Sequence, residues 1–365
     1  MKPTHPDQGR SQANSPLSVP LPQPHASQWV VFSIIIFVTL YVARGFLLPV
    51  FSSLLLAYAL IPFVRILTRL KIPRVIAAFL VVGLFTASFT YGIYALSTPA
   101  IEWLEKAPQS FDRVERLLES IKRPVDNVNA ASERLNQMAQ GEDGGREVVV
   151  RMKESDFINV VLNQTPIVIG AVISTLIFLF FLLAYGDLLM RRVVEISPRL
   201  RDKIKAVDAA REVETSVSKY LVTVSLINVA LGLCVGISLF ALGFENPILW
   251  GALATMFNFI PYLGAIAGVG LLGLASFTVN SDPQVALVYP GVYLLLTVLE
   301  GHFITPMILG RSFMINPIFI ILVLVFLGWM WGVVGAVMAV PLLVAAKAAA
   351  AHFESTRQLA TLLSR

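Results

Sequence analysis

The chain has 365 residues, of which 56% are hydrophobic and 14% are charged, and its formal net charge is +5. Soluble domains carry about a quarter charged residues, so this composition excludes an ordinary soluble protein and predicts an all-α polytopic membrane protein. The single cysteine, Cys234, cannot form an intramolecular disulfide. The basic residues flank apolar runs, and this distribution gives no indication of nucleic-acid binding.

The N-terminal segment, residues 1–28, contains six prolines and two basic residues. No small-residue cleavage site follows the apolar run that begins at Trp29. We therefore expect a disordered cytoplasmic tail ahead of a retained first span, and not a cleaved signal peptide.

Residues 29–97 are predicted to form the first three transmembrane spans. A single helix over 29–61 would be about 50 Å long, well beyond the roughly 30 Å hydrocarbon core, so we expect a tight hairpin of two helices that turns near Arg44. The loop 65–74 has four basic residues and no acidic one, which places it in the cytoplasm by the positive-inside rule. The third span is expected to end outside, at Pro99.

Residues 98–158 form a polar insert with twelve acidic and nine basic residues. Apolar residues recur in it at 3-4 spacing, which predicts one amphipathic helix, or two that meet at Pro124. We expect an extracytoplasmic helical insert whose apolar seam packs on itself or on another subunit. Residues 140–145 are predicted as a turn and 146–151 as a short strand.

The fourth span, 159–186, leads into a charged cytoplasmic helical loop at 187–219. Spans five to eight occupy 220–349, and a cytoplasmic tail follows at 350–365. Within these spans the uncharged stretch 246–281 is too long for one straight crossing, so it is either two short helices or a re-entrant pair. Counted as one crossing, it gives about eight crossings and places both termini in the cytoplasm.

The sequence Asn-Pro-Ile occurs twice, at 246 and at 316, and opens an apolar region each time. Asn as the N-cap with Pro at the first helical position is typical of a helix start. Glycine pairs at GxxxG spacing predict close helix packing, mainly within one chain; they are Gly232/Gly236, Gly264/Gly268 and Gly328/Gly332.

Two interrupted helices are the candidate functional elements, because interrupted helices are typical of transporter repeats. The first is broken by Asn258, Pro261 and Gly264. Backbone groups left unbonded in a membrane cost several kcal/mol unless they line a cavity or are buried in protein. The break therefore belongs either to a kinked, well-packed helix or to the wall of a pathway.

Glu300 lies in the second interrupted helix and is the only charged residue between Asp282 and Arg311. A carboxylate at mid-membrane costs roughly 2.5–3.5 kcal/mol, and such residues usually mark a pathway. At the end of a span the cost is small, so Glu300 is either a working group or the polar end of a helix. The nearby His302 is expected to be structural.

No enzyme signature is present. The sequence has four histidines, no HExxH motif and no phosphate-binding GxxxxGK[ST] loop. We therefore expect a protein that is not an enzyme, with no cofactor, no metal and no ATP coupling.

Five segments, in order, resemble the autoinducer-2 exporter family, the PurR-regulated permease-like bacterial membrane transporters. They are PVFSSLLLAYALIP (49–62), the long insert before the fourth span, NFIPYLG (258–264), EGHFITPMILGRSFMINP (300–317) and WGVVGAVMAVPL (331–342). At Asn316 the family usually has histidine, so a proton-handling role at this position is doubtful while its helix-capping role remains.

The resemblance implies a secondary transporter in the bacterial cytoplasmic (inner) membrane, a homo-oligomer that exports a small polar metabolite or a signalling molecule such as autoinducer-2. It does not fix the substrate. The positions that match the family motifs, and that we carry over as candidates for the transport pathway, are Asn258, Pro261, Gly264, Glu300, Pro306, Gly310 and Pro317.

Two other functions stay open from the sequence. One is a Na⁺(Li⁺)/H⁺ antiporter in which Glu300 alternately binds a proton and the cation. The other is a non-transporting membrane scaffold whose insert at 98–158 recruits partners.

Overall fold

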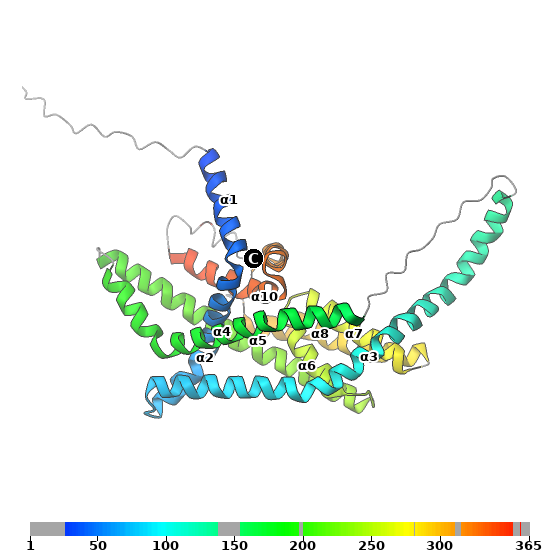
Figure 1. The fold of residues 1–365 in the computed structure, drawn as a ribbon, viewed down its shortest axis with the longest axis horizontal. Coiled ribbons are helices and arrows are strands. Elements are labelled where there is room, and N and C mark those ends of the chain that lie inside the picture. The colour runs from blue at the N-terminus through cyan, green and yellow to red at the C-terminus, as the bar shows by residue number, and fades with distance from the viewer. Residues whose placement is uncertain are drawn as a thin grey trace, which may run out of the picture. The chain divides into compact units, whose positions relative to one another are not determined.

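The computed structural model describes residues 26–137, 154–196, 200–280, 282–310 and 315–352, together with residue 358. Helices make up nearly all of this part of the chain (Figure 1). The predicted turn at 140–145 and the predicted strand at 146–151 lie outside the described residues, as does most of the tail 1–28. The predicted all-α membrane fold with interrupted helices is confirmed.

The first apolar region is divided into two helices, as predicted. Helix α1 spans Ala26–Val42 and α2 spans Arg44–Arg69, so the break falls at Ala43, beside the expected turn at Arg44. Helix α1 belongs to a separate structural unit that ends at Ala43, and the second unit begins with α2. The tight hairpin between these helices stays a prediction.

Helix α3 spans Arg74–Gln137, so it continues without a break past Pro99, where the third span is predicted to end. The helix also continues through Pro124, so one helix and not two occupies the first part of the insert. Proline removes one backbone donor, but tertiary packing can hold the helix together across it. Here Trp103, one turn beyond Pro99, is buried with its ring centroid 5.4 Å from that of Trp250.

Helix α4 spans Glu154–Ile196 and packs against both α2 and α3. Small side chains line this contact: Ala57 of α2 and Ala77 and Ala78 of α3 are almost fully buried. Their size lets the backbones approach closely, which is how helices associate in a membrane. The predicted charged loop 187–219 is helical where it is described, because α4 continues to Ile196 and α5 starts soon after it.

Helix α5 spans Leu200–Ala241, and the uncharged stretch after it forms two short helices, which both arrangements left open by the sequence allow. They are α6, Pro247–Phe257, and α7, Leu263–Val279. Helix α6 packs on α5 through glycines, since a Cβ added to Gly232 would overlap Thr255 and one added to Gly251 would overlap the carbonyl oxygen of Gly232. The Gly232/Gly236 pair therefore packs within one chain, as expected.

Helices α6 and α7 run antiparallel, as their contacts with α8, Pro283–Leu299, show. Helix α7 is antiparallel to α8, because Ser276 donates a hydrogen bond to the carbonyl of Ala286 while Gly268 packs on Tyr293. Helix α6 is parallel to α8: rings near its start lead from Trp250 through Phe244 to Tyr289, and the residue at its end, Asn258, contacts Glu300.

The pair α6–α7 is therefore a helical hairpin with its tip at residues 258–262. Eleven and seventeen helical residues correspond to about 16 Å and 25 Å, both shorter than a 30 Å hydrocarbon core. The re-entrant pair that the sequence allowed for 246–281 stays a prediction, and the antiparallel arrangement is compatible with it.

The last element of the main unit, α10, spans Pro317–His352 and bends sharply at Gly332, where φ is 68° and ψ is −152°. Only glycine adopts this backbone conformation readily. The bend brings Gly335 so close to Leu327 that an added Cβ would overlap the Leu327 carbonyl oxygen. The two ends of the helix also approach each other, because Ile315 and Ala348 line the same cavity.

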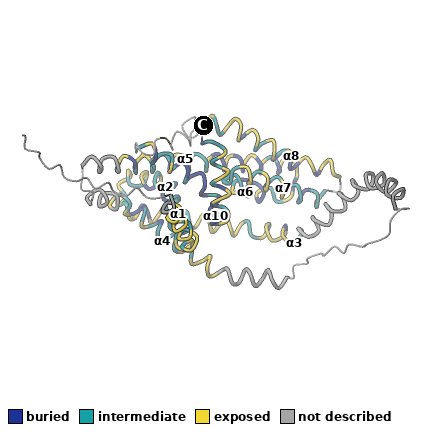
Figure 2. Tube along the Cα trace, turned by 90° about the horizontal axis from the view of Figure 1, so that it is seen from above, coloured by how far each residue is buried: buried dark blue, intermediate teal, exposed yellow. Residues whose placement is uncertain are grey.

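Six helices in the described part of the chain are long and apolar enough to span a membrane. The eight apolar segments counted from the sequence correspond to these six, to α1 and to the α6–α7 hairpin. Exposed residues follow much of α3 (Figure 2), and many are large and apolar, among them Leu84 and Tyr94. Such a surface is expected where a helix faces lipid.

Candidate functional site

Four polar side chains from three parts of the chain meet at the tip of the α6–α7 hairpin. Asn228 lies in the middle of α5, Asn258 follows the last residue of α6, and Glu300 and Thr305 lie just beyond α8. We call these four residues the polar cluster. Two of them are buried, since 7% of Glu300 and 1% of Asn228 are exposed.

Hydrogen bonds join the four side chains. The Nδ2 group of Asn258 donates to Oδ1 of Asn228 at 2.9 Å and to Oε2 of Glu300 at 3.3 Å. The hydroxyl of Thr305 donates to the other carboxylate oxygen, Oε1 of Glu300. Both oxygens of the buried carboxylate therefore accept hydrogen bonds from neutral groups, which offsets part of the cost of burying it.

One donor in the polar cluster has no protein acceptor. The Nδ2 group of Asn228 is fully buried, and no described residue accepts a hydrogen bond from it. An unsatisfied buried donor costs about 1–3 kcal/mol, and native proteins contain few of them. Asn228 thus offers an N–H group that an oxygen atom of a small bound molecule can satisfy.

The sequence at the hairpin tip explains how Asn258 reaches this position. Helix α6 ends at Phe257, Pro261 lies in the connection, and Tyr262 has a φ of 63°, so the chain reverses over five residues. A Cβ on Gly264 would overlap the backbone carbonyl of Phe257, so only glycine fits there. Pro261 and Gly264 therefore build the tip, and Asn258 is its polar member.

A π-helical turn, η1, at Glu300–Ile304 brings Glu300 and Thr305 together. In a regular α-helix, residues five positions apart lie about 140° apart around the axis, whereas the wider turn places them on one face. The short helix α9, Thr305–Leu309, follows, with Pro306 in its first turn. Proline lacks the donor that a regular helix needs here, and π turns of this kind are frequent at functional sites.

The remaining predicted residues lie away from the polar cluster. Gly310 ends α9 with a φ of 69°, and Pro317 begins α10. Asn316 caps α10 as predicted, since its Oδ1 accepts a hydrogen bond from the backbone of Ile318 at 3.0 Å. Asn246 precedes Pro247 at the start of α6, but it makes no side-chain capping bond. His302 is exposed, and a ring nitrogen lies 3.1 Å from the Val298 carbonyl oxygen.

Asn228 and Thr305 are not among the residues predicted from the sequence. Asn228 is a polar residue in the uncharged run 220–244, so it carries the same signal that singled out Asn258. Thr305 could not be recognised in this way, because its contact with Glu300 depends on the π turn. Hydroxyl groups are also common in membrane helices, where they bond to their own backbone, as Thr297 does.

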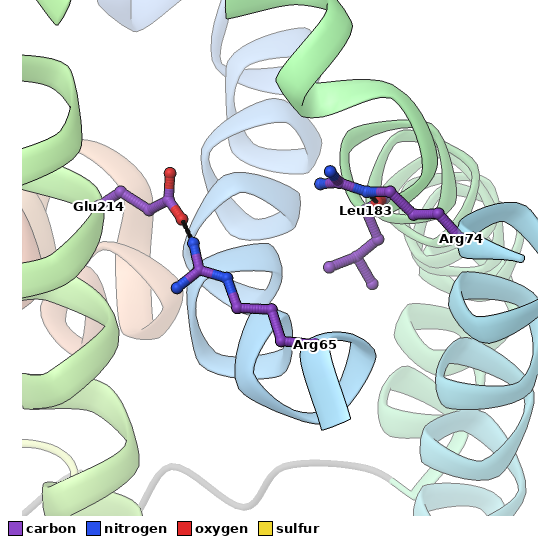
Figure 3. Close-up of polar contacts among 4 residues, drawn as sticks. All are labelled: Arg65, Arg74, Leu183 and Glu214. Atoms are coloured by element: carbon purple, nitrogen blue, oxygen red, sulfur yellow. Dashed lines mark hydrogen bonds and ion pairs between the residues drawn. The ribbon is translucent and has the colours of Figure 1, made fainter. Parts of the chain in front are cut away.

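A second group of polar contacts ties the helices together farther along the bundle (Figure 3). Arg65 of α2 forms an ion pair with Glu214 of α5 at 2.5 Å, and Nε of Arg74 at the start of α3 donates to the carbonyl of Leu183 in α4 at 2.9 Å. These contacts join four helices, and we assign them a structural role.

Comparison with known proteins identifies the family. The sequence model of the AI-2E family transporters matches residues 30–355. The chain is 24% identical to the AI-2 transport protein TqsA of Escherichia coli over 88% of this chain and 90% of that protein. It is also 24% identical to YrrI of Bacillus subtilis, over 89% and 95% of the two chains. The chain belongs to the AI-2E family of transporters.

Proposed function

We propose that this protein is a secondary transporter that exports a small polar metabolite, with a signalling molecule such as autoinducer-2 as the first candidate. We further propose that the polar cluster is its solute site. Family membership and the name of the TqsA relative support transport of such a solute. The observation that carries the proposal is the hydrogen-bonded network of Asn228, Asn258, Glu300 and Thr305, two of them buried, at the tip of the α6–α7 hairpin.

The chemistry of the network suits a molecule rich in hydroxyl groups. A hydroxyl both donates and accepts hydrogen bonds, and the polar cluster offers both kinds of partner: the Glu300 carboxylate accepts, and the free Nδ2 group of Asn228 donates. Irregular backbone at membrane depth is tolerated where it lines a cavity or lies buried in protein. Transporter sites are often built from such interrupted helices.

Export from intact cells tests this function. Cells that lack the gene would be complemented with the wild type, with Asn258→Ala, or with Asn280→Ala as a matched control at the far end of α7, where the side chain caps its own helix. We expect the wild type and the control to restore the extracellular signal. With Asn258→Ala the signal should be about tenfold or more below that of the wild type, because the site loses the one to two hydrogen bonds that the Asn258 amide donates. Equal export with and without the gene would exclude this solute.

The second candidate function is Na⁺(Li⁺)/H⁺ antiport through Glu300. In its favour, Glu300 is the only charged residue that is buried among the described residues. Against it, the carboxylate oxygens already accept hydrogen bonds from the amide of Asn258 and the hydroxyl of Thr305. A hard cation binds oxygen ligands, so it would need an oxygen atom where the amide nitrogen of Asn258 now donates.

A proton-flux assay separates the two functions. Purified protein would be reconstituted in liposomes that contain a pH-sensitive dye, and Na⁺ or Li⁺ would be added outside to the wild type and to Glu300→Gln. Solute export predicts no cation-driven flux in either protein. A flux in the wild type that Glu300→Gln abolishes would establish antiport instead.

Three further features belong to the same proposal. We place the protein in the bacterial inner membrane with both termini in the cytoplasm, because the basic loop at 65–74 follows α2. We expect a homo-oligomer, as the resemblance implies. A non-transporting scaffold receives no support from membership of a transporter family.

A further inference from the structure

Four aromatic rings from four segments meet at one end of the bundle. Trp103 lies in α3, Phe244 follows α5, Trp250 lies in α6 and Tyr289 lies in α8. The ring centroid of Trp103 is 5.4 Å from that of Trp250 and 6.0 Å from that of Phe244. The rings of Phe244 and Tyr289 are 4.5 Å apart. All four side chains are buried, and we call them the aromatic clasp.

The aromatic clasp lies at the end of the bundle where the insert begins. Trp103 is 29 residues beyond Arg74 in the unbroken helix α3, which corresponds to about 43 Å. This length exceeds the roughly 30 Å of a hydrocarbon core. The clasp is therefore at the opposite end of α3 from the basic loop 65–74, and in the topology proposed above that end is extracytoplasmic.

Two helices connect the aromatic clasp with the polar cluster. Helix α6 leads from Trp250 to Asn258 over about 12 Å, and α8 leads from Tyr289 to Glu300 over about 16 Å. These helices are parallel, and their facing side chains belong with the rings to one buried apolar group. A solute that leaves the polar cluster between α6 and α8 toward this end therefore meets the clasp.

The contact between α3 and the rest of the clasp combines close packing with unsatisfied donors. The indole N–H groups of Trp103 and Trp250 are buried, and no described residue accepts a hydrogen bond from either. Each unsatisfied donor opposes the packing that buries it, and separation of the two rings would expose both N–H groups to water or lipid headgroups. Beyond Trp103, Lys106 pairs with Glu245 at 3.0 Å, but these side chains are 41% and 47% exposed, so the ion pair adds little.

We propose that the aromatic clasp is the extracytoplasmic gate of the solute path; this assignment rests on the transport function and the solute site proposed above. In the described structure Trp103 closes the gate. The gate opens when the end of α3 moves away from the loop 242–246, so that Trp103 leaves Phe244 and Trp250. Elements that move in function come from the less stable parts of a fold, and the two unsatisfied donors make this contact such a part.

Spin-label distances test the motion without any solute. Cysteines would replace the exposed residues Ile101 and Leu242 in a Cys234→Ser background, and both would carry nitroxide labels in liposomes. We expect a short and a long distance, and Trp103→Leu should raise the population of the long distance about fivefold, because two ring contacts are lost. Tyr94→Leu, which removes an exposed ring from the same helix, should leave the distribution unchanged. A single distance that Trp103→Leu does not alter would overturn the gate.

Crosslinking separates a gate from a contact that only stabilises the fold. Lys106→Cys/Glu245→Cys would be joined by a bifunctional thiosulfonate, which a reductant removes again. The locked protein should keep its Tm but export about tenfold less, because the solute cannot pass a closed gate, and reduction should restore export. Lys106→Cys with a monofunctional reagent is the control and should export as the wild type does.

The outcomes distinguish the gate from the transport function. Full export by the crosslinked protein would overturn the gate and leave the proposed function intact. If the wild type does not export the solute either, the proposed function fails for that solute, and the spin-label distances alone decide whether the clasp opens.

Discussion

The carboxylate of Glu300 is held by two neutral donors, the amide of Asn258 and the hydroxyl of Thr305. A guanidinium partner would bind a carboxylate through two charge-assisted bonds and would be hard to displace. Amide and hydroxyl donors stabilise the group less strongly, so a solute hydroxyl can exchange with them at small cost. Asn228 adds a buried donor that no described residue uses, which supports the proposal that a polar solute binds here.

Removing the Thr305 hydroxyl should weaken both transport and the fold. Thr305→Val leaves one oxygen of the buried carboxylate without its donor, and hydrogen bonds to charged groups contribute about 1.5–3 kcal/mol. We expect a lower Tm of the purified protein in detergent and a loss of export in cells. Thr297→Val is the control, because the Thr297 hydroxyl bonds to the Tyr293 carbonyl of its own helix at 2.9 Å. Equal effects of the two substitutions would contradict the role of Thr305.

At the scale of the element, the α6–α7 hairpin places Asn258 of its tip against Asn228 and Glu300 because its two helices can pack closely at the reversal. Gly264 lies against the backbone of Phe257, and Gly268 lies against the ring of Tyr293. Both glycines are buried on the face of α7 that meets other protein, whereas Gly270 is surrounded by open space. The position of Asn258 therefore depends on a close backbone contact that no larger residue permits.

Gly264→Ala should displace the hairpin tip. The added methyl group would overlap the Phe257 carbonyl, and overpacking of this kind typically costs about 1–3 kcal/mol. We expect a lower Tm and loss of export even though no residue of the polar cluster changes. Gly270→Ala, in the same helix, meets nothing within 4 Å and should keep or raise stability, since alanine favours helix. Normal export by Gly264→Ala would rule out the close contact.

At the scale of the whole molecule, the main unit is held by apolar packing together with a few polar links between helices. Buried alanines join α2, α3 and α4, and a second apolar group joins α2, α5 and α10. The bond from Arg74 to the Leu183 carbonyl adds a polar link between α3 and α4 of the first group, and the Arg65–Glu214 pair adds one between α2 and α5 of the second (Figure 3). The two arginine contacts differ in exposure, and this difference decides what each contributes.

Arg74→Gln should lower stability more than Arg65→Gln. The Arg65 side chain is 64% exposed, and exposed ion pairs contribute about 0–1 kcal/mol and weaken with salt. Arg74 is half-buried and donates to a backbone carbonyl that would lose its charged partner, which costs about 1.5–3 kcal/mol. Thermal denaturation at low and high salt measures both effects. The difference in Tm between the wild type and Arg65→Gln should shrink at high salt, whereas the difference between the wild type and Arg74→Gln should not. The reverse order would show that the ion pair is the stronger link.

The sequence indicates most of the helices and half of the polar cluster, for physical reasons. Polar residues and prolines are rare inside spans, so Asn258, Pro261 and Glu300 are conspicuous and the re-entrant pair is among the expected folds. The sharp bend in α10 leaves no such signal, because Gly332 lies in a uniformly apolar run and its GxxxG spacing with Gly328 indicates packing instead. The continuation of α3 beyond Pro99 is not indicated by the sequence either, because a proline alone does not reveal the packing of Trp103 in this helix.

The bend at Gly332 changes how the topology of the C-terminal region is to be mapped. Hydropathy counts α10 as one span, which would place residues 315 and 352 in different compartments. Yet Ile315 and His352 line one cavity, so both ends should be labelled from the same compartment. A re-entrant α6–α7 hairpin would likewise return to the side that it leaves. With both features the number of crossings falls by two, so a reporter enzyme fused to the C-terminus would be found on the same side under either topology and would not reveal the difference.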